Sequence, residues 1–210
     1  LQLVSNEVVA TFHPAGHILG AASVSLASKS GTVFFSGDIS VAEQRTLPGM
    51  LAPQIKPDVV VMESTYGDRL HEDRTERIQR LGNILTKALS DNGKVFIPAF
   101  SLGRTQELIY EMDRLFSDTE LKQTFPDSNR EKKIPVFVDS PLGLDLTKVY
   151  SGLSEYWDKE AREIYRTGDH PINFDHLYAV RDYKDHLKLL DIPGPSIIIA
   201  GSGMCTGGRI

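Results

Sequence analysis

Three polar residues of this chain follow short apolar segments, at points where a strand gives way to a loop. His17 lies in AGHILGA, Asp38 follows VFFSG, and Glu63 follows VVVM. A neutral imidazole is a common zinc ligand, and a carboxylate can bridge two cations. The ends of buried strands are where α/β folds assemble metal and catalytic sites. The three residues are therefore candidates for one metal site.

Each of these residues also has a structural interpretation. His17 could be hydrogen-bonded within a tight turn, and Asp38 could cap the turn that follows it by accepting backbone N–H groups. Glu63 could cap a helix or pair with Arg69 or Arg74. A carboxylate directly after a buried strand must be paired or desolvated at a cost. The residues alone leave both interpretations open.

Glycine-rich segments follow three other apolar stretches and are typical of anion-binding loops. In PAFSLGRTQE, Ser101 precedes the start of an expected helix, and Arg104 can add a charged fork. In IIIAGSGMCTGGR, the small residues Ser202, Gly203 and Thr206 suit a phosphate nest. A third stretch reads VDSPLG. Carboxyl ends of parallel strands share one edge of a sheet, where ligands bind. Plain tight turns are the alternative.

The hydrophobic pattern changes along the chain from short strands to strands that alternate with helices. Strands are expected at 8–12, 22–28, 32–37, 56–64, 93–100, 134–141 and 195–204, and helices at 74–89, 104–116, 142–153, 154–168 and 182–192. The apolar run at 59–62, within the expected strand 56–64, predicts a strand covered on both faces. The polar stretch 118–134 predicts an irregular surface excursion. Alternating strands and helices predict an α/β fold with a mainly parallel sheet flanked by helices.

Composition narrows the class of protein. With 210 residues, 40% hydrophobic and 24% charged, the chain has the composition of an ordinary soluble globular protein. No apolar run approaches the roughly 20 residues that span a bilayer, so no membrane partner is expected. A net charge of −5 argues against a chain-wide basic surface. One cysteine fits a reducing cytoplasm, our expected location. The first residue is Leu, so we expect a segment of a longer protein.

Several other reactive residues receive structural interpretations. We expect His13 to be structural, His186 to be solvated on a polar helix face, and Cys205 to be a packing residue. Trp157 is expected in the core or in an interface rather than as a platform for stacking bases. The oligomeric state cannot be read from these features, and a homodimer is one alternative.

Six ordered motifs give this chain a resemblance to a known family. They read AGHILGAA, SGDIS, ESTYGDR, PAFSLGRTQEL, VDSPLG and SGMCTGGR. In this order and spacing they resemble the β-CASP branch of the metallo-β-lactamase superfamily, which includes RNA-processing nucleases. The resemblance extends over nearly the whole chain. It implies that 1–66 is the C-terminal part of a metallo-β-lactamase-like half and that 67–210 is a β-CASP domain.

The same resemblance implies roles for the residues singled out above. His17 would be a zinc ligand, Asp38 would bridge two zinc ions, and Glu63 would orient a catalytic histidine. In such a two-metal template, a water between the ions becomes a nucleophile at neutral pH. The loops with Ser101 and Ser202 would grip RNA phosphates beside the cut.

Departures from the family pattern limit what this segment is expected to do. The main metal motif of the family, His-x-His-x-Asp-His, is absent from residues 1–16, and two later histidine motifs of the family do not occur. We therefore expect a zinc-dependent ribonuclease as the full-length protein, with the isolated segment inactive and binding zinc weakly or not at all. The alternatives are a non-catalytic relative that binds RNA or serves as a scaffold, and a nuclease that acts on DNA.

Overall fold

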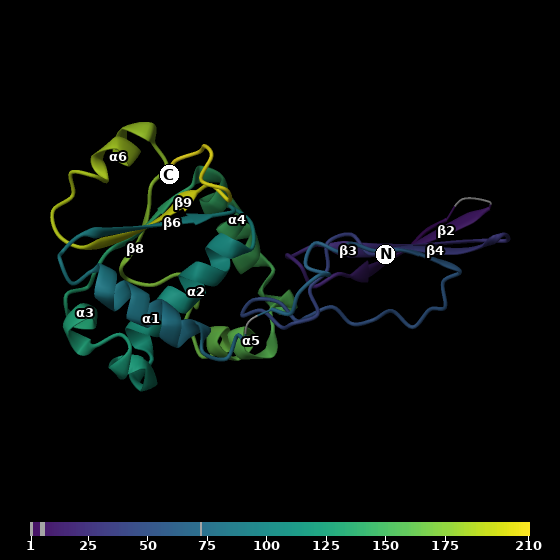
Figure 1. Cartoon of the computed structure of the whole chain (residues 1–210), viewed down its shortest axis with the longest axis horizontal. Helices are drawn as coiled ribbons and strands as arrows, with labels where there is room; N and C mark the ends of the chain where they lie inside the picture. Colours follow the sequence, from purple (N-terminus) through teal and green to yellow (C-terminus); the bar gives the residue numbers. More distant parts are fainter. Residues whose placement is uncertain (1, 5–6, 72) are drawn as a thin grey trace. The chain divides into compact units, whose positions relative to one another are not determined.

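The computed structural model describes residues 2–4, 7–71 and 73–210, which fold as two compact units. The first unit combines Leu1–Glu72 with Glu155–Ala161, and the second combines Asp73–Ser154 with Arg162–Ile210. Figure 1 shows strands as the main elements of the first unit and a sheet with helices in the second. Within the described ranges, no helix is long and apolar enough to cross a membrane.

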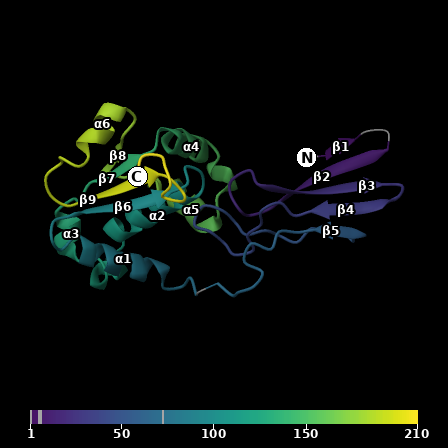
Figure 2. The same ribbon diagram turned by 45° about the horizontal axis from the view of Figure 1, so that its top comes forward.

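The first unit is built on a five-stranded sheet with the order β1-β2-β3-β4-β5 (Figure 2). Its strands are β1 (Gln2–Val4), β2 (Val8–Pro14), β3 (Ala22–Ser28), β4 (Gly31–Phe35) and β5 (Val59–Val61). Neighbouring strands are antiparallel except β4 and β5, which run parallel. Strands β2, β4 and β5 therefore point the same way, and their carboxyl ends lie at one edge of the sheet. The loops that carry the metal-type residues leave from that edge.

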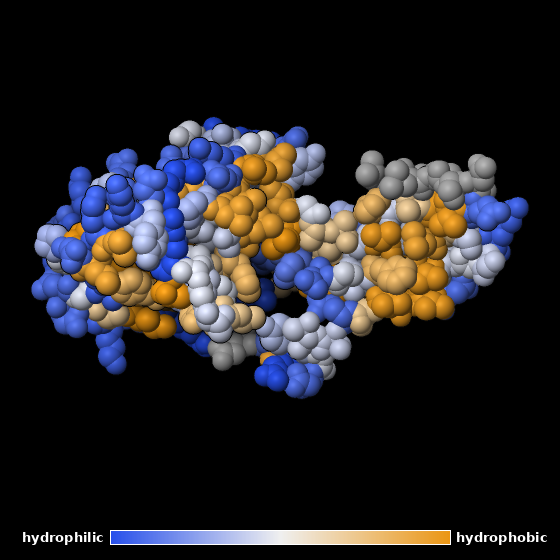
Figure 3. All heavy atoms as spheres, turned by 90° about the horizontal axis from the view of Figure 1, so that it is seen from above, coloured by the Kyte–Doolittle hydropathy of each residue, from blue (hydrophilic) through white to orange (hydrophobic). Residues whose placement is uncertain are grey.

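Strand β5 corrects one expectation. The run of valines predicted a strand covered on both faces, but Val59, Val60 and Val61 are 51%, 55% and 50% exposed. The reason is position, because β5 is an edge strand that pairs with β4 alone in the described sheet. Hydrophobic side chains lie at the surface of this unit in Figure 3. The valine run correctly predicted an apolar strand, but the prediction that both faces of this strand are buried was wrong.

The second unit has a four-stranded, wholly parallel sheet with the order β6-β9-β7-β8. Its strands are β6 (Lys94–Ala99), β7 (Val136–Asp139), β8 (Leu177–Ala179) and β9 (Ser196–Gly201). The interior strand β9 carries the core, since its residues from Ile197 to Ala200 are at most 1% exposed. The parallel sheet with helices confirms the predicted α/β class, although β8 was not expected.

Six α-helices connect or flank these strands in the described ranges: α1 (Arg77–Ala88), α2 (Arg104–Ser117), α3 (Asp127–Glu131), α4 (Pro141–Gly152), α5 (Lys159–Arg166) and α6 (Tyr183–Lys188). Helices α1 and α6 lie on opposite faces of the sheet (Figures 1 and 2). Ser140 is the N-cap of helix α4, and its Oγ accepts the Gly143 N–H at 3.1 Å. Pro141 fits the first turn, where its missing N–H costs no hydrogen bond.

The segment 118–134 is a second correction. It contains a 3₁₀ helix, Thr119–Gln123, and the short helix α3, rather than irregular structure. Phe125 is fully buried, and its ring lies 5.3 Å from that of Phe116. The sequence did not predict that this segment packs in the core, because its few apolar residues are scattered among charged ones. They nevertheless anchor the segment in the core.

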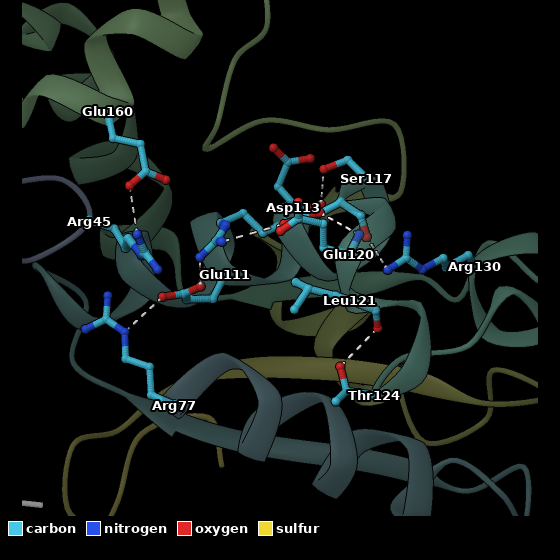
Figure 4. Close-up of polar contacts among 12 residues, drawn as sticks. Arg45, Arg77, Glu111, Asp113, Ser117, Glu120, Leu121, Thr124, Arg130 and Glu160 are labelled. Carbon is cyan, nitrogen blue, oxygen red and sulfur yellow. Dashed lines mark hydrogen bonds and ion pairs between the residues drawn. The ribbon is translucent and has the colours of Figure 1, made fainter. Parts of the chain in front are cut away.

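An ion pair joins the start of α1 to α2 (Figure 4). The Arg77 Nε donates to the Glu111 Oε1 at 3.1 Å, and the Arg114 Nη1 donates to the other oxygen at 3.4 Å. One turn of α2 also holds Asp113, which is 9% exposed. Burial, and then the charge of Asp169, raise the pKa of the Asp113 carboxyl from 3.8 to about 7.

Candidate metal-binding pair and phosphate loops

His17 and Asp38 lie beside each other at the carboxyl-end edge of the first sheet. The His17 Nε2 is 3.9 Å from the Asp38 Oδ2, and the two side chains are 45% and 77% exposed. His17 stands in the loop between β2 and β3, whereas Asp38 follows β4. The fold thus brings together two residues that are separated in the chain by two complete strands, β3 and β4.

Backbone contacts hold the His17 loop against the segment that contains Asp38. The Gln44 side-chain amide donates to the His17 carbonyl at 2.9 Å, and the Ser40 N–H donates to the Ala15 carbonyl at 3.0 Å. Gly16 has φ +70°, and a Cβ there would lie 2.3 Å from the Met50 nitrogen. Only glycine fits this close approach. The sequence signal was the glycine directly before the histidine.

Glu63 is hydrogen-bonded to the segment around Asp38. Its Oε1 accepts the Ile39 N–H at 2.8 Å, and its own N–H donates to the Ser36 Oγ at 3.0 Å. The Ile39 bond, followed by the Thr65 hydroxyl, lowers the pKa of the Glu63 carboxyl below its usual value. Glu63 is therefore held as an anion next to Asp38.

The His17–Asp38 pair has the donor chemistry of a zinc site. Zinc binds imidazole nitrogen at about 2.0–2.1 Å and carboxylate oxygen at about 2.0–2.2 Å. The observed separation of 3.9 Å is compatible with both atoms reaching one ion. In the ranges that the structure describes, no group of three or more histidine, cysteine or acidic residues converges on one point. The pair thus offers two donors, fewer than the four of a typical zinc site.

Two of the predicted phosphate-binding loops meet through their serine hydroxyls in the second unit. Ser101, after β6, and Ser140, after β7, have their Oγ atoms 3.0 Å apart. Ser140 is 4% exposed. The Gln106 side chain lies behind this pair, accepting the Gly103 N–H at 2.7 Å and donating to the Ser101 carbonyl at 3.1 Å. These hydroxyls organise the loops.

The third loop, after β9, joins the same edge. The Ser202 N–H donates to the carbonyl of Ala99 at 3.1 Å, and a Cβ on Gly203 would lie 2.1 Å from the Phe100 ring. Thr206 is exposed, as is Arg104 at the start of α2. The candidates Ser101, Arg104, Ser202, Gly203 and Thr206 therefore lie in adjoining loops.

The stretch VDSPLG places Asp139 at a strand end, but the burial of its carboxylate beneath these loops was not predicted. Asp139 ends β7, is fully buried, and binds His186 and Arg209. His186 was expected to be solvated, and that prediction was wrong because α6 turns its ring towards Asp139. Cys205 was expected to pack, but it is exposed. His13 bonds Ser25 Oγ at 2.9 Å, in keeping with a structural role.

Comparison with known proteins identifies the family. A model of the Beta-Casp domain matches residues 105–210, which is half of the chain. The chain belongs to the β-CASP family of the metallo-β-lactamase superfamily. Strands β7, β8 and β9 and the loops that follow β7 and β9 lie within the matched region, whereas β6 and the loop with Ser101 precede it.

Curated relatives of this β-CASP chain are similar over nearly its whole length. A ribonuclease of Thermus thermophilus is 33% identical over 95% of the chain and 43% of its own length. Cleavage and polyadenylation specificity factor 73 of Drosophila melanogaster is 34% identical over 92% of the chain and 26% of its own length. Endoribonuclease YSH1 of Yarrowia lipolytica is 31% identical over 97% of the chain and 23% of its own length. The chain spans less than half of each relative.

Proposed function

We propose that the full-length protein is a zinc-dependent ribonuclease that hydrolyses phosphodiester bonds of RNA. The observation that carries this proposal is the exposed His17–Asp38 pair at 3.9 Å in a β-CASP chain. Relatives that match the pair's surroundings are named ribonuclease and endoribonuclease. When bound, two zinc ions supply a water that is a nucleophile at neutral pH and a charge that stabilises the attacked phosphate.

The residues of this chain would share the work as follows. The His17 Nε2 would be a ligand of one zinc ion, and the Asp38 carboxylate would be a ligand shared by both ions. Glu63 holds the backbone beside Asp38 through Ile39, so that the carboxylate keeps its direction. Ser101, Arg104, Ser202, Gly203 and Thr206 bind phosphates of the RNA, because loop N–H groups and a guanidinium favour anions.

The organisation of the protein forms part of the same proposal. We assign 1–66 to the metallo-β-lactamase-like half and 67–210 to the β-CASP domain. Hydrolysis belongs to the full-length polypeptide, because two donors are too few for a dizinc centre. One exposed cysteine that needs no oxidising compartment supports a cytoplasmic location.

One experiment separates this proposal from its competitors. The full-length protein is incubated with end-labelled single-stranded RNA, or with DNA of the same sequence, after treatment with a chelator and again after zinc is restored. We expect RNA to be cut only with zinc, and DNA to be cut at least about tenfold more slowly. Preferential cutting of DNA would favour a DNA-directed nuclease. RNA binding that does not need zinc, without any cutting, would favour a non-catalytic relative.

A further inference from the structure

Asp139 is a fully buried carboxylate whose two oxygens bind partners from distant parts of the chain. Its Oδ1 accepts a hydrogen bond from the Arg209 Nη1 at 2.7 Å, and its Oδ2 lies 2.5 Å from the His186 Nδ1. Taking a carboxylate out of water is costly unless it is paired and hydrogen-bonded. The position of Asp139 is therefore coupled to the positions of both partners.

Arg209 is held in place by three contacts at the end of the glycine-rich loop. Besides bonding Asp139, its Nη2 donates to the Arg181 carbonyl at 2.8 Å, and its backbone N–H donates to the Gly201 carbonyl at 3.4 Å. Its side chain is 20% exposed. The guanidinium is thus directed into the fold, where its charge faces a carboxylate.

The loop Ser202–Gly208 consequently has a closed neck and an exposed body. The neck is formed where the Arg209 N–H bonds the Gly201 carbonyl. Gly208 has φ +97°, and a Cβ there would clash with the Gly201 carbonyl oxygen at 2.1 Å. The residues from Met204 to Gly208 are exposed. Such a loop presents backbone groups to solvent while its ends stay fixed.

We propose that Asp139 is a positioning residue that, through Arg209 and His186, fixes the loop Ser202–Gly208 for binding RNA phosphates. The proposal rests on the proposed function, because it assigns RNA to this loop. Asp139 touches no substrate itself. His186 contributes by joining α6 to the same carboxylate, and its ring stacks on Tyr183 with the centroids 5.2 Å apart.

The alternative is that Arg209 binds phosphate directly, and the two ideas predict opposite results. If charge alone mattered, Asp139→Asn would remove a negative charge near the RNA and strengthen binding. Arg209→Lys would then also keep much of its affinity, because lysine retains the positive charge. Under the positioning role both variants weaken binding, since asparagine lacks the charge and lysine lacks the fork that reaches Asp139 and Arg181 together.

The test measures RNA affinity of the full-length protein by fluorescence anisotropy, with a fluorescein-labelled single-stranded RNA and a chelator present to prevent cutting. We expect Asp139→Asn and Arg209→Lys each to raise Kd by about tenfold, the effect of losing one charged hydrogen bond. The matched control is Asp145→Asn, the same change at a carboxylate that is 62% exposed and pairs with Arg181. It should stay within about twofold of wild type. Wild-type affinity of Arg209→Lys, or tighter binding by Asp139→Asn, would overturn the proposal.

A second measurement does not depend on RNA. Hydrogen exchange of the amides in Ser202–Gly208 should be about tenfold faster in Asp139→Asn, while the amides of α1 keep their wild-type rates. Gly208→Ala serves as a second variant that keeps the Asp139 side chain: its added Cβ would lie 2.1 Å from the Gly201 oxygen and open the neck, so it should give the same pattern. Unchanged loop exchange in Asp139→Asn would overturn the positioning role, whatever the result for Gly208→Ala. Wild-type protein that fails to bind RNA would overturn the proposed function instead, and the exchange rates would then decide the positioning role alone.

Discussion

The Glu63 carboxylate accepts a hydrogen bond from the backbone N–H of Ile39 at 2.8 Å, immediately after Asp38. The Glu63 N–H in turn bonds the Ser36 Oγ, before Asp38. Glu63, just after β5, is thus hydrogen-bonded to the segment after β4 on both sides of the exposed Asp38 carboxylate. These hydrogen bonds link the ESTYGDR motif to the backbone on either side of the proposed metal ligand.

Glu63→Ala should weaken zinc binding by the full-length protein by about 10–100-fold, the usual effect of removing a group that orients a metal ligand. Glu63→Gln should cost less, since its amide oxygen can still accept the Ile39 N–H. Competition with a chromogenic chelator measures both affinities. Glu43→Ala, the same change at an exposed residue of the neighbouring segment, is the control. Equal affinities for Glu63→Ala and Glu43→Ala would contradict the orienting role.

Phe125→Ala should destabilise the protein by about 3–5 kcal/mol, because it removes a fully buried ring and leaves a cavity beside Phe116. Urea unfolding followed by circular dichroism measures the change. Ile84→Ala is the comparison, since Ile84 is 62% exposed on α1; it should change stability by less than about 1 kcal/mol. A small effect at Phe125 would mean that the segment 118–134 is peripheral after all.

Asp113 should make the protein less stable as pH rises from about 4 to about 7. In that interval the unfolded carboxyl, with its ordinary pKa of 3.8, has lost its proton, whereas the folded one, with a pKa of about 7, retains it. The folded state therefore binds more protons, and unfolding becomes easier as the pH increases. Above pH 7 the penalty is constant, on the order of 4 kcal/mol for this difference in pKa.

The variant Asp113→Asn isolates this contribution. It should flatten the decline in the free energy of unfolding between pH 4 and 7 and raise stability at pH 8. Asp175→Asn removes an exposed carboxylate from the same unit and should leave the decline in place. Identical pH profiles for wild type and Asp113→Asn, obtained from urea melts, would show that this carboxyl does not cause the effect.

The sequence predicted the elements better than it predicted their coverage. Periodicity identified α2 and the apolar strands, and strand ends located His17, Asp38 and the glycine-rich loops. The sequence could not show that Val59–Val61 form an edge strand, because the burial of a strand depends on which elements lie beside it. The burial of Phe125 was also not predicted, because a single aromatic residue among charged ones forms no periodic pattern.

The candidate site shows the same division. Residue types and local glycines indicated His17 and Asp38, but their 3.9 Å separation depends on the register of β2, β3 and β4. The contact between Asp139 and Arg209 joins residues 70 positions apart in the chain. No local pattern marks it, and only the parallel order of β7 and β9 brings the two residues together.

The role of Asp38 is tested most directly by single-turnover cleavage of labelled single-stranded RNA by zinc-loaded full-length protein. Asp38→Asn keeps the size of the side chain but removes the charge that bridges cations, and it should slow cleavage by at least about 100-fold, or roughly 2.7 kcal/mol in the barrier. His13→Gln, a change at a histidine that bonds Ser25, should stay within about threefold of wild type. Cleavage by Asp38→Asn at the wild-type rate would contradict the account.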